Sequence, residues 1–144
     1  GFMKGLPQTS RRILEEARTM APDHPGVLAQ FGVWHMDVFR RGGKSGAKRL
    51  KADFETGLGY WREAQAIDPG NFSMSLHGAF ILLSMEDPAY ADEAKTVLQR
   101  IANAPTGNDL DASFAARAKT VLGHLDGDGQ DALEDDLNAW LGRK

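Results

Sequence analysis

The sequence predicts an all-α protein built from about seven helices. Apolar residues recur at helical spacing along almost the whole chain, whereas runs of alternating β-branched residues, which would indicate strands, are absent. Proline and glycine residues divide this pattern into segments of helical length. With 144 residues and 42% hydrophobic content, the chain can bury one core or one continuous stack of helices.

The N-terminal half predicts three helices. The first covers 9–20 and carries Ile13 and Leu14 on its apolar face. The second covers 25–40 and ends at Gly42, because a glycine that follows basic residues is a typical helix C-terminus. The third covers 45–67 and is unusually long.

The C-terminal half predicts four shorter helices, each with an apolar stripe and each bounded by proline or glycine residues. They cover 72–85, 90–103, 110–125 and 130–141.

Composition excludes several classes of site. The chain has no cysteine, which removes disulfides, thiolate metal sites and cysteine nucleophiles. Its net charge of −3 argues against a protein that binds nucleic acid over its whole surface. The longest apolar run, 79–83, is far shorter than a membrane span. Gly1-Phe2-Met3 is not a usual start, so we expect that an upstream segment has been removed, and the compartment stays open.

Gly43-Lys44-Ser45 matches the end of a phosphate-binding P-loop, but the rest of that motif is missing. Val38 stands where the first glycine is required, and the preceding segment predicts a helix instead of a strand. We therefore expect no nucleotide site here.

Proline residues also mark an internal repeat. Pro22, Pro69 and Pro105 each follow a helical segment, and the second interval is close to a repeat unit of about 34 residues. The first interval is longer, and its extra residues fall around 40–53.

This pattern resembles the tetratricopeptide repeat family, whose repeats are helix hairpins. The first helix of a hairpin is matched twice, by Leu28, Phe31-Gly32 and His35 and by Met74, His77-Gly78 and Ile81. The second helix is matched by Gly57, Trp61, Ala64 and Pro69, and by Ser10, Leu14, Ala17 and Pro22. Later copies of the repeat keep only part of this spacing. With these copies included, the resemblance covers about 9–125.

The resemblance implies a single domain over 1–144, a right-handed superhelical stack of antiparallel hairpins. It divides into a capping or half repeat (9–22), a repeat with an insertion at 40–53 (25–69), a repeat (71–105) and a degenerate C-terminal repeat or cap (110–141). Small residues such as Gly32 and Gly57 should let paired helices approach closely, and Trp61 should be buried beside them.

The resemblance also implies a non-enzymatic protein-interaction or scaffold module, whose concave groove binds a peptide or protein of unknown identity. The implied lining is Ala29, Val33, Met36, Asp37, Phe72, Ser75, Ala79, Leu82 and Lys119. The alternative for Phe72, Ala79 and Leu82 is that they belong to the core. The lysine and asparagine set with which some members of the family hold a peptide carboxylate is absent from these positions.

A second candidate surface is the basic insertion. Residues 40–51 include six basic residues, and no acid follows them before Asp53: Arg40, Arg41, Lys44, Lys48, Arg49 and Lys51. Such a stretch could bind an acidic protein, lipid headgroups or nucleic acid in a helical regulatory domain, or simply be a solvated helix end. Aromatic residues do not alternate with the cations, which argues against stacking on bases.

No other motif predicts chemistry. Asp126, Asp128 and Gln130 have the opening spacing of a calcium loop, but its required glycine and final glutamate are missing. The histidines are too scattered to form a metal pair, and we expect His35 and His77 to be packed structural residues. The sequence thus predicts no catalytic residue, metal or cofactor.

Overall fold

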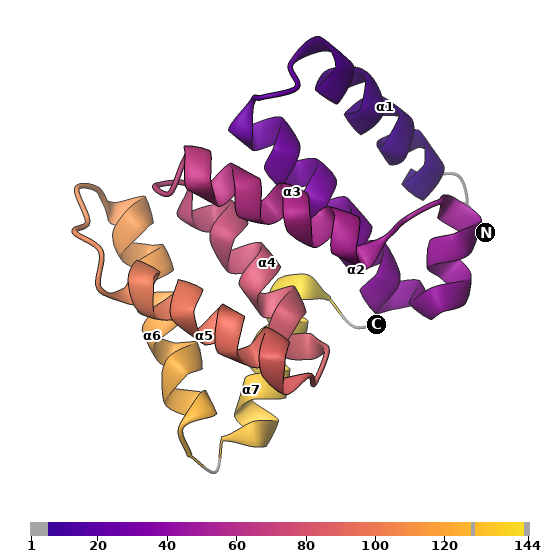
Figure 1. The fold of residues 1–144 in the computed structure, drawn as a ribbon. Helices are drawn as coiled ribbons and strands as arrows, with labels where there is room; N and C mark the ends of the chain where they lie inside the picture. Colours follow the sequence, from indigo (N-terminus) through magenta and orange to yellow (C-terminus); the bar gives the residue numbers. More distant parts are fainter. Residues whose placement is uncertain (1–5, 128, 143–144) are drawn as a thin grey trace. The chain divides into compact units, whose positions relative to one another are not determined.

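The computed structural model describes residues 6–127 and 129–142, with side chains from residue 8 onward, and throughout these residues the regular structure is helical (Figure 1). The opening residues and Asp128, on which two of the sequence expectations fall, lie outside the described part. The helices are α1 (Leu6–Met20), α2 (Pro25–Leu50), α3 (Phe54–Ile67), α4 (Phe72–Ser84), α5 (Pro88–Ala102), α6 (Asp109–Leu125) and α7 (Gln130–Leu141). The predicted all-α class and number of helices are confirmed.

Side chains before the helices explain where several of them begin. Asp53 precedes α3 and accepts a hydrogen bond from the backbone N–H of Thr56, and Asn108 does the same for Asp111 in α6. His24 has this role before α2, where its Nδ1 accepts from Gly26 at 3.1 Å. Each acceptor satisfies a backbone donor that the first helical turn leaves unpaired.

The predicted long third helix is wrong. Residues 45–50 belong to the end of α2, and this end is separated from the rest of the helix by a kink at Gly43, which has φ 62°. Lys51 then adopts the left-handed conformation, and the N–H of Ala52 donates to the carbonyl of Ala47 at 2.8 Å. This hydrogen bond is typical of a helix end, and α3 starts only after Asp53. The predicted stop near Gly42 therefore corresponds to a kink.

The chain divides into two compact units, one up to Met74 and the other from Ser75 to the end of α7. The first unit contains α1, α2, α3 and the start of α4. Whether the two units form one continuous stack of repeats depends on how they are joined. The single repeat domain over 1–144 therefore stays a prediction.

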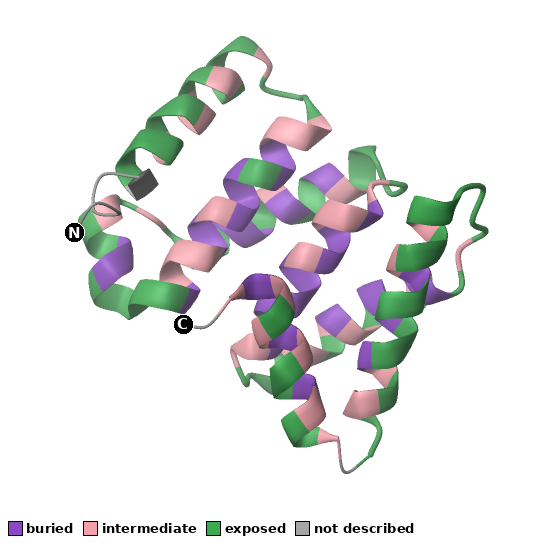
Figure 2. Ribbon diagram, turned by 180° about the vertical axis from the view of Figure 1, so that it is seen from behind, coloured by how far each residue is buried: buried purple, intermediate pink, exposed green. Residues whose placement is uncertain are grey.

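In the first unit α2 packs closely on α3. A Cβ added to Gly32 would lie 2.6 Å from the carbonyl oxygen of Gly57, so these two backbones are nearly in contact. Trp61 is fully buried, as predicted, and its indole N–H donates to the carbonyl of Met74 at 3.0 Å. Figure 2 shows that α1, by contrast, has only exposed and intermediate residues among those described.

In the second unit α5 packs on α6, and α6 on α7. Trp140 of α7 makes edge contacts with Phe80 and Phe114, and the guanidinium of Arg117 lies 5.3 Å from its ring. Ala94, Leu98, Ile101, Ala118 and Val121 are fully buried and supply the apolar side chains of this core. No helix in 6–127 or 129–142 combines the length and apolarity that crossing a membrane requires.

Candidate anion-binding surface

Most of the side chains predicted to line a groove are buried in this structure. They are Ala29, Val33, Met36, Phe72, Ser75, Ala79 and Leu82, each with 9% or less of its surface exposed. Their burial supports the alternative that Phe72, Ala79 and Leu82 belong to the core. Lys119 is exposed, and Asp37 is partly exposed.

Arg40 is not available on the basic surface. Its side chain is 1% exposed, and one guanidinium nitrogen lies 3.4 Å from a carboxylate oxygen of Asp37. Removal from water lowers the pKa of Arg40, an effect that Asp37 opposes. The other oxygen of Asp37 pairs with Arg41 at 2.8 Å. Asp37, predicted as part of the groove, therefore balances two arginines of its own helix.

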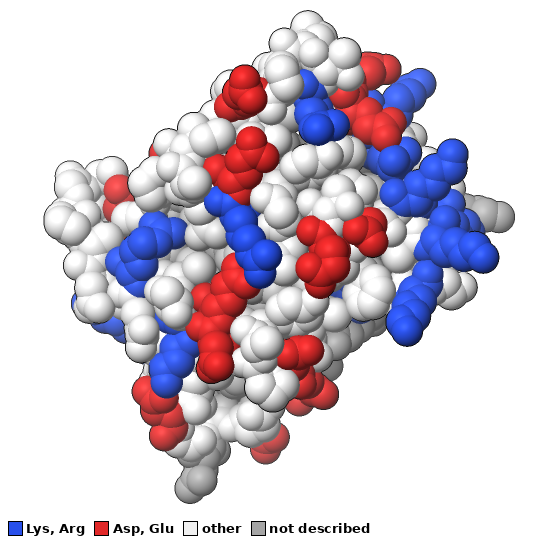
Figure 3. Space-filling view, in the orientation of Figure 1, with Lys and Arg blue, Asp and Glu red and all other residues white. Residues whose placement is uncertain are grey.

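The remaining basic residues of the stretch lie beyond the kink at Gly43. Lys44, Lys48, Arg49 and Lys51 are all exposed. Lys and Arg side chains gather at the right of Figure 3, in the region where Figure 1 places α1 and the end of α2. We call Lys44, Lys48, Arg49 and Lys51, together with Arg11 and Arg12 of α1, the basic surface.

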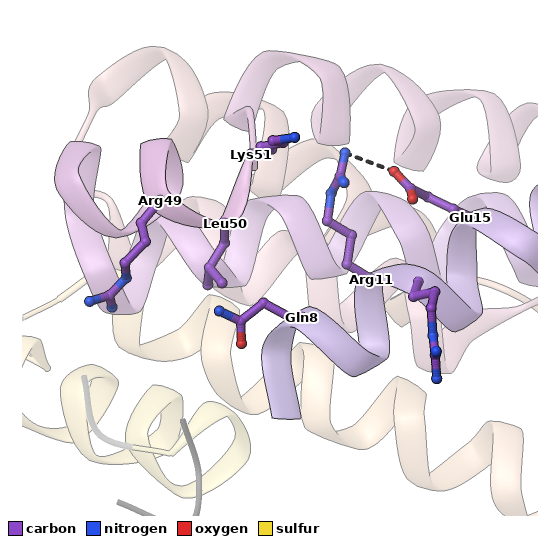
Figure 4. Close-up of a pocket in the computed structure, with 7 residues that line it drawn as sticks. Gln8, Arg11, Glu15, Arg49, Leu50 and Lys51 are labelled. Atoms are coloured by element: carbon purple, nitrogen blue, oxygen red, sulfur yellow. Dashed lines mark ion pairs between the residues drawn. The ribbon is translucent and has the colours of Figure 1, made fainter. Parts of the chain in front are cut away.

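A first cavity, of about 210 Å³, lies where α1 meets the end of α2 (Figure 4). It is lined by Gln8, Arg11, Arg12 and Glu15 from α1 and by Arg49, Leu50 and Lys51. Among these residues Glu15 is the only acid, and it pairs with Arg11 at 2.8 Å. The cavity therefore presents an excess of positive charge to a ligand.

A second cavity, of about 530 Å³, adjoins the first because both are lined by Arg11, Glu15 and Lys51. Its other lining residues are Arg18, Thr19, Phe31, His35, Asp53, Thr56 and Tyr60. Helices α1, α2 and α3 all contribute to it. Its wall combines cations, hydroxyl groups and aromatic rings.

Arginine–aromatic contacts connect α1 to the rest of the unit. The guanidinium of Arg18 lies 4.7 Å from the ring centre of Tyr60, and that of Arg11 lies 5.9 Å from the ring centre of Trp34. The ring of Phe31 stacks on Tyr60 at 5.5 Å. A cation over an aromatic face is attracted by the electrons of the ring. No side chain of α1 is buried among those described, so these contacts add to the packing of its half-buried side chains on α2.

His35 forms part of the wall of the second cavity and is buried, as predicted for a structural histidine. Its Nδ1 accepts a hydrogen bond from the backbone N–H of Asp53 at 2.9 Å, which requires an unprotonated nitrogen. Burial, and next the positive charge of Arg11, lowers the pKa of His35 to about 4. The imidazole is therefore neutral at physiological pH.

The structure brings together cations that the sequence analysis kept apart. Arg11, Arg12 and Arg18 were not predicted as site residues, although Arg11 and Arg18 are seven residues apart and so share a helix face. That spacing was the available signal. The part of the chain that the structure describes contains no group of three potential metal ligands. His77 is partly buried, and His124 contacts Asp136 at 2.7 Å.

No family model matches the chain, and neither the curated proteins nor the solved structures include one with significant similarity to it. The resemblance to tetratricopeptide repeats therefore depends on the residues quoted above.

Proposed function

We propose that this protein is a non-enzymatic helical interaction module that binds an acidic segment of a partner protein through the basic surface. One observation carries the proposal: cations from α1 and from the end of α2, distant in the sequence, line one cavity that contains a single carboxylate, already paired. An acidic segment is complementary to this excess of charge.

The groove that tetratricopeptide repeats use for peptides is a weaker candidate, because most of the side chains expected to line it are buried. Both interpretations describe a protein-interaction module, and they differ in the surface that is used. Nucleic acid is a weaker partner than an acidic protein segment, because the rings beside the basic surface are occupied. Arg11 lies over Trp34, and Arg18 lies over Tyr60, so these rings are not available for stacking on bases.

The test compares two labelled peptides of equal length, one rich in Asp and Glu and one neutral, by fluorescence anisotropy at several salt concentrations. We expect binding of the acidic peptide only, with an affinity that falls as salt rises. Replacing Lys44, Lys48, Arg49 and Lys51 together by glutamine should weaken binding roughly tenfold or more, since several surface ion pairs of about 0.5 kcal/mol each are lost.

Arg62→Gln is the matched control, because Arg62 is exposed on α3 in the same unit and lines neither cavity. The Arg62→Gln variant should bind the acidic peptide with the same affinity as the unmodified protein. Equal binding of both peptides, or binding that is insensitive to salt, would instead support the apolar groove. Binding of a single-stranded oligonucleotide in preference to the acidic peptide would assign the surface to nucleic acid.

A further inference from the structure

Arg11 and Lys51 occupy a special position, because both line the first cavity and the second. In Figure 4 the ammonium group of Lys51 and the guanidinium of Arg11 point toward the same space. Two like charges that converge in this way repel each other, and an anion between them would be attracted to both, which makes the total interaction favourable.

The donors of Arg11 are only partly used. One terminal nitrogen pairs with Glu15 at 2.8 Å, and no other acceptor contacts the guanidinium among the described residues. Its Nε is shielded from solvent, so a ligand would reach the terminal nitrogens. Lys51 has no carboxylate within salt-bridge distance in the described part of the chain. Both residues therefore retain the capacity to bind an acceptor.

The acids that line the second cavity do not supply this acceptor. Glu15 is paired with Arg11, and Asp53 accepts hydrogen bonds from the backbone N–H and the hydroxyl of Thr56, at 2.9 and 2.7 Å. Arg18 adds a third cation to the same wall. The charges of the lining residues thus favour an added oxyanion over an added cation or a neutral ligand.

We propose that the second cavity is a binding site for one oxyanion, a carboxylate or phosphate group, held between Arg11 and Lys51. Arg11 supplies hydrogen bonds in a planar arrangement that matches such a group, and Lys51 supplies a point charge. The bound anion connects α1 to the residue at which α2 ends. This inference goes beyond the proposed function, because a free small anion can fill the site as well as a side chain of a partner.

The first experiment titrates inorganic sulfate into ¹⁵N-labelled protein at constant ionic strength, with chloride as the balancing ion. We expect saturable shifts of the amide signals of Arg11, Lys51 and their neighbours. Lys51→Asn should weaken sulfate binding at least about fivefold, the effect of losing roughly 1 kcal/mol, because asparagine keeps the left-handed backbone of this position without its charge. Arg62→Gln should leave the affinity unchanged.

Arg11→Gln tests the second residue that holds the anion. This change also removes contacts between α1 and the rest of the unit. Loosening of α1 would itself raise the pKa of His35, because burial and Arg11 lower it, so the readout is the change in this pKa when sulfate is added to each variant. His35 faces Arg11, Glu15 and Arg18 of α1, Lys51 and Asp53 of the connection, and Tyr60 of α3. A bound anion should raise its pKa by roughly half a unit or more, as expected for a charge several ångströms away. Lys51→Asn should abolish the part of this rise that depends on sulfate.

Two further arms identify the source of the anion. Glutarate and inorganic phosphate represent free ligands, and the acidic peptide represents a partner segment. Saturable binding of the small anions assigns the site to a free ligand, whereas shifts seen only with the peptide assign it to the partner. If the peptide binds with equal affinity to unmodified protein and to Lys51→Asn, the oxyanion site is refuted while the proposed function stands. Linear, nonsaturating shifts with every anion would also refute it.

Discussion

Gly32 of α2 and Gly57 of α3 face each other at the point where the two helices are closest. A Cβ on Gly32 would lie 2.6 Å from the carbonyl oxygen of Gly57, and a Cβ on Gly57 would lie 2.6 Å from the carbonyl oxygen of Gly32. Both obstacles are backbone atoms, which cannot rotate away as a flexible side chain could. The separation of the two helices is therefore set by the absence of both side chains.

Gly32→Ala should destabilise the protein by at least about 2 kcal/mol, because the helices must move apart to admit the methyl group. The control is Gly59→Ala, also on α3, where an added Cβ meets no atom within 4 Å. That change should stabilise the helix by about 0.5–1 kcal/mol through its higher helix propensity. Urea unfolding of both variants gives the comparison, and similar stabilities for the two would contradict the close approach.

Trp61→Ala should lower the free energy of unfolding by roughly 3–5 kcal/mol, because it removes the largest fully buried side chain of the first unit. Trp61→Phe should have a smaller effect, since it keeps most of the apolar volume and loses the hydrogen bond to the carbonyl of Met74. Denaturant unfolding followed by circular dichroism measures both. A loss below about 1 kcal/mol for the alanine variant would be inconsistent with a packed indole.

The free energy of unfolding should decrease as the pH is lowered, because of His35. Its pKa is lowered from 6.5 to about 4 on folding, so between these values the unfolded chain binds a proton that the folded chain excludes. The contribution of the neutral imidazole is complete above about pH 6.5 and is progressively lost down to about pH 4. The loss should reach about 3 kcal/mol, because each pKa unit corresponds to about 1.4 kcal/mol.

His35→Asn isolates this effect, because asparagine places an acceptor oxygen where Nδ1 accepts from Asp53 and does not titrate in this range. Its urea midpoint should depend less on pH between 4 and 6.5 than that of the unmodified protein. Parallel pH profiles for the two proteins would mean that another group is responsible.

Lys44→Ala should change stability by less than about half a kcal/mol, as is usual for an exposed residue. We also expect no binding of ATP or GTP. The segment before Gly43-Lys44-Ser45 is the helix α2, so the strand that presents a phosphate-binding loop is missing. Isothermal titration calorimetry with magnesium nucleotides is the measurement. Nucleotide binding that Lys44→Ala abolishes would overturn this interpretation.

The helices were predictable where a local signal marks both ends. The bounds of α7 agree with the prediction, because glycine residues precede and follow its apolar stripe. The contact of Gly32 with Gly57 was also predictable, since the repeat pattern places a small residue on each helix.

The predicted start of the third helix was wrong for a local reason. The apolar spacing continues through residues 45–54, and a lysine seldom adopts the left-handed conformation that ends α2 at Lys51. Asp53 is a typical N-cap, but the periodicity outweighed that signal. A helix boundary that depends on an unusual backbone conformation gives little warning in the sequence.

The site was predicted only in part. Lys44, Lys48, Arg49 and Lys51 followed from the sequence, because consecutive cations are visible there. Arg40 was wrongly included in the basic surface. Its side chain is buried because it lies on the inner face of α2, which the run of cations does not reveal. The contribution of α1 was missed because it arises from tertiary contacts between arginines and aromatic rings.

The kink at Gly43 separates two kinds of evolutionary change. A side chain added at Gly42 would meet no atom within 4 Å, whereas one added at Gly32 on the same helix would collide with α3. Gly43 itself has a positive φ, which a side chain would strain. An exposed side chain can therefore change at this corner while the packing of α2 on α3 is unaffected. Under the proposed function, varying a few residues there would change the partner, and the same corner offers a place to graft a label or a recognition sequence.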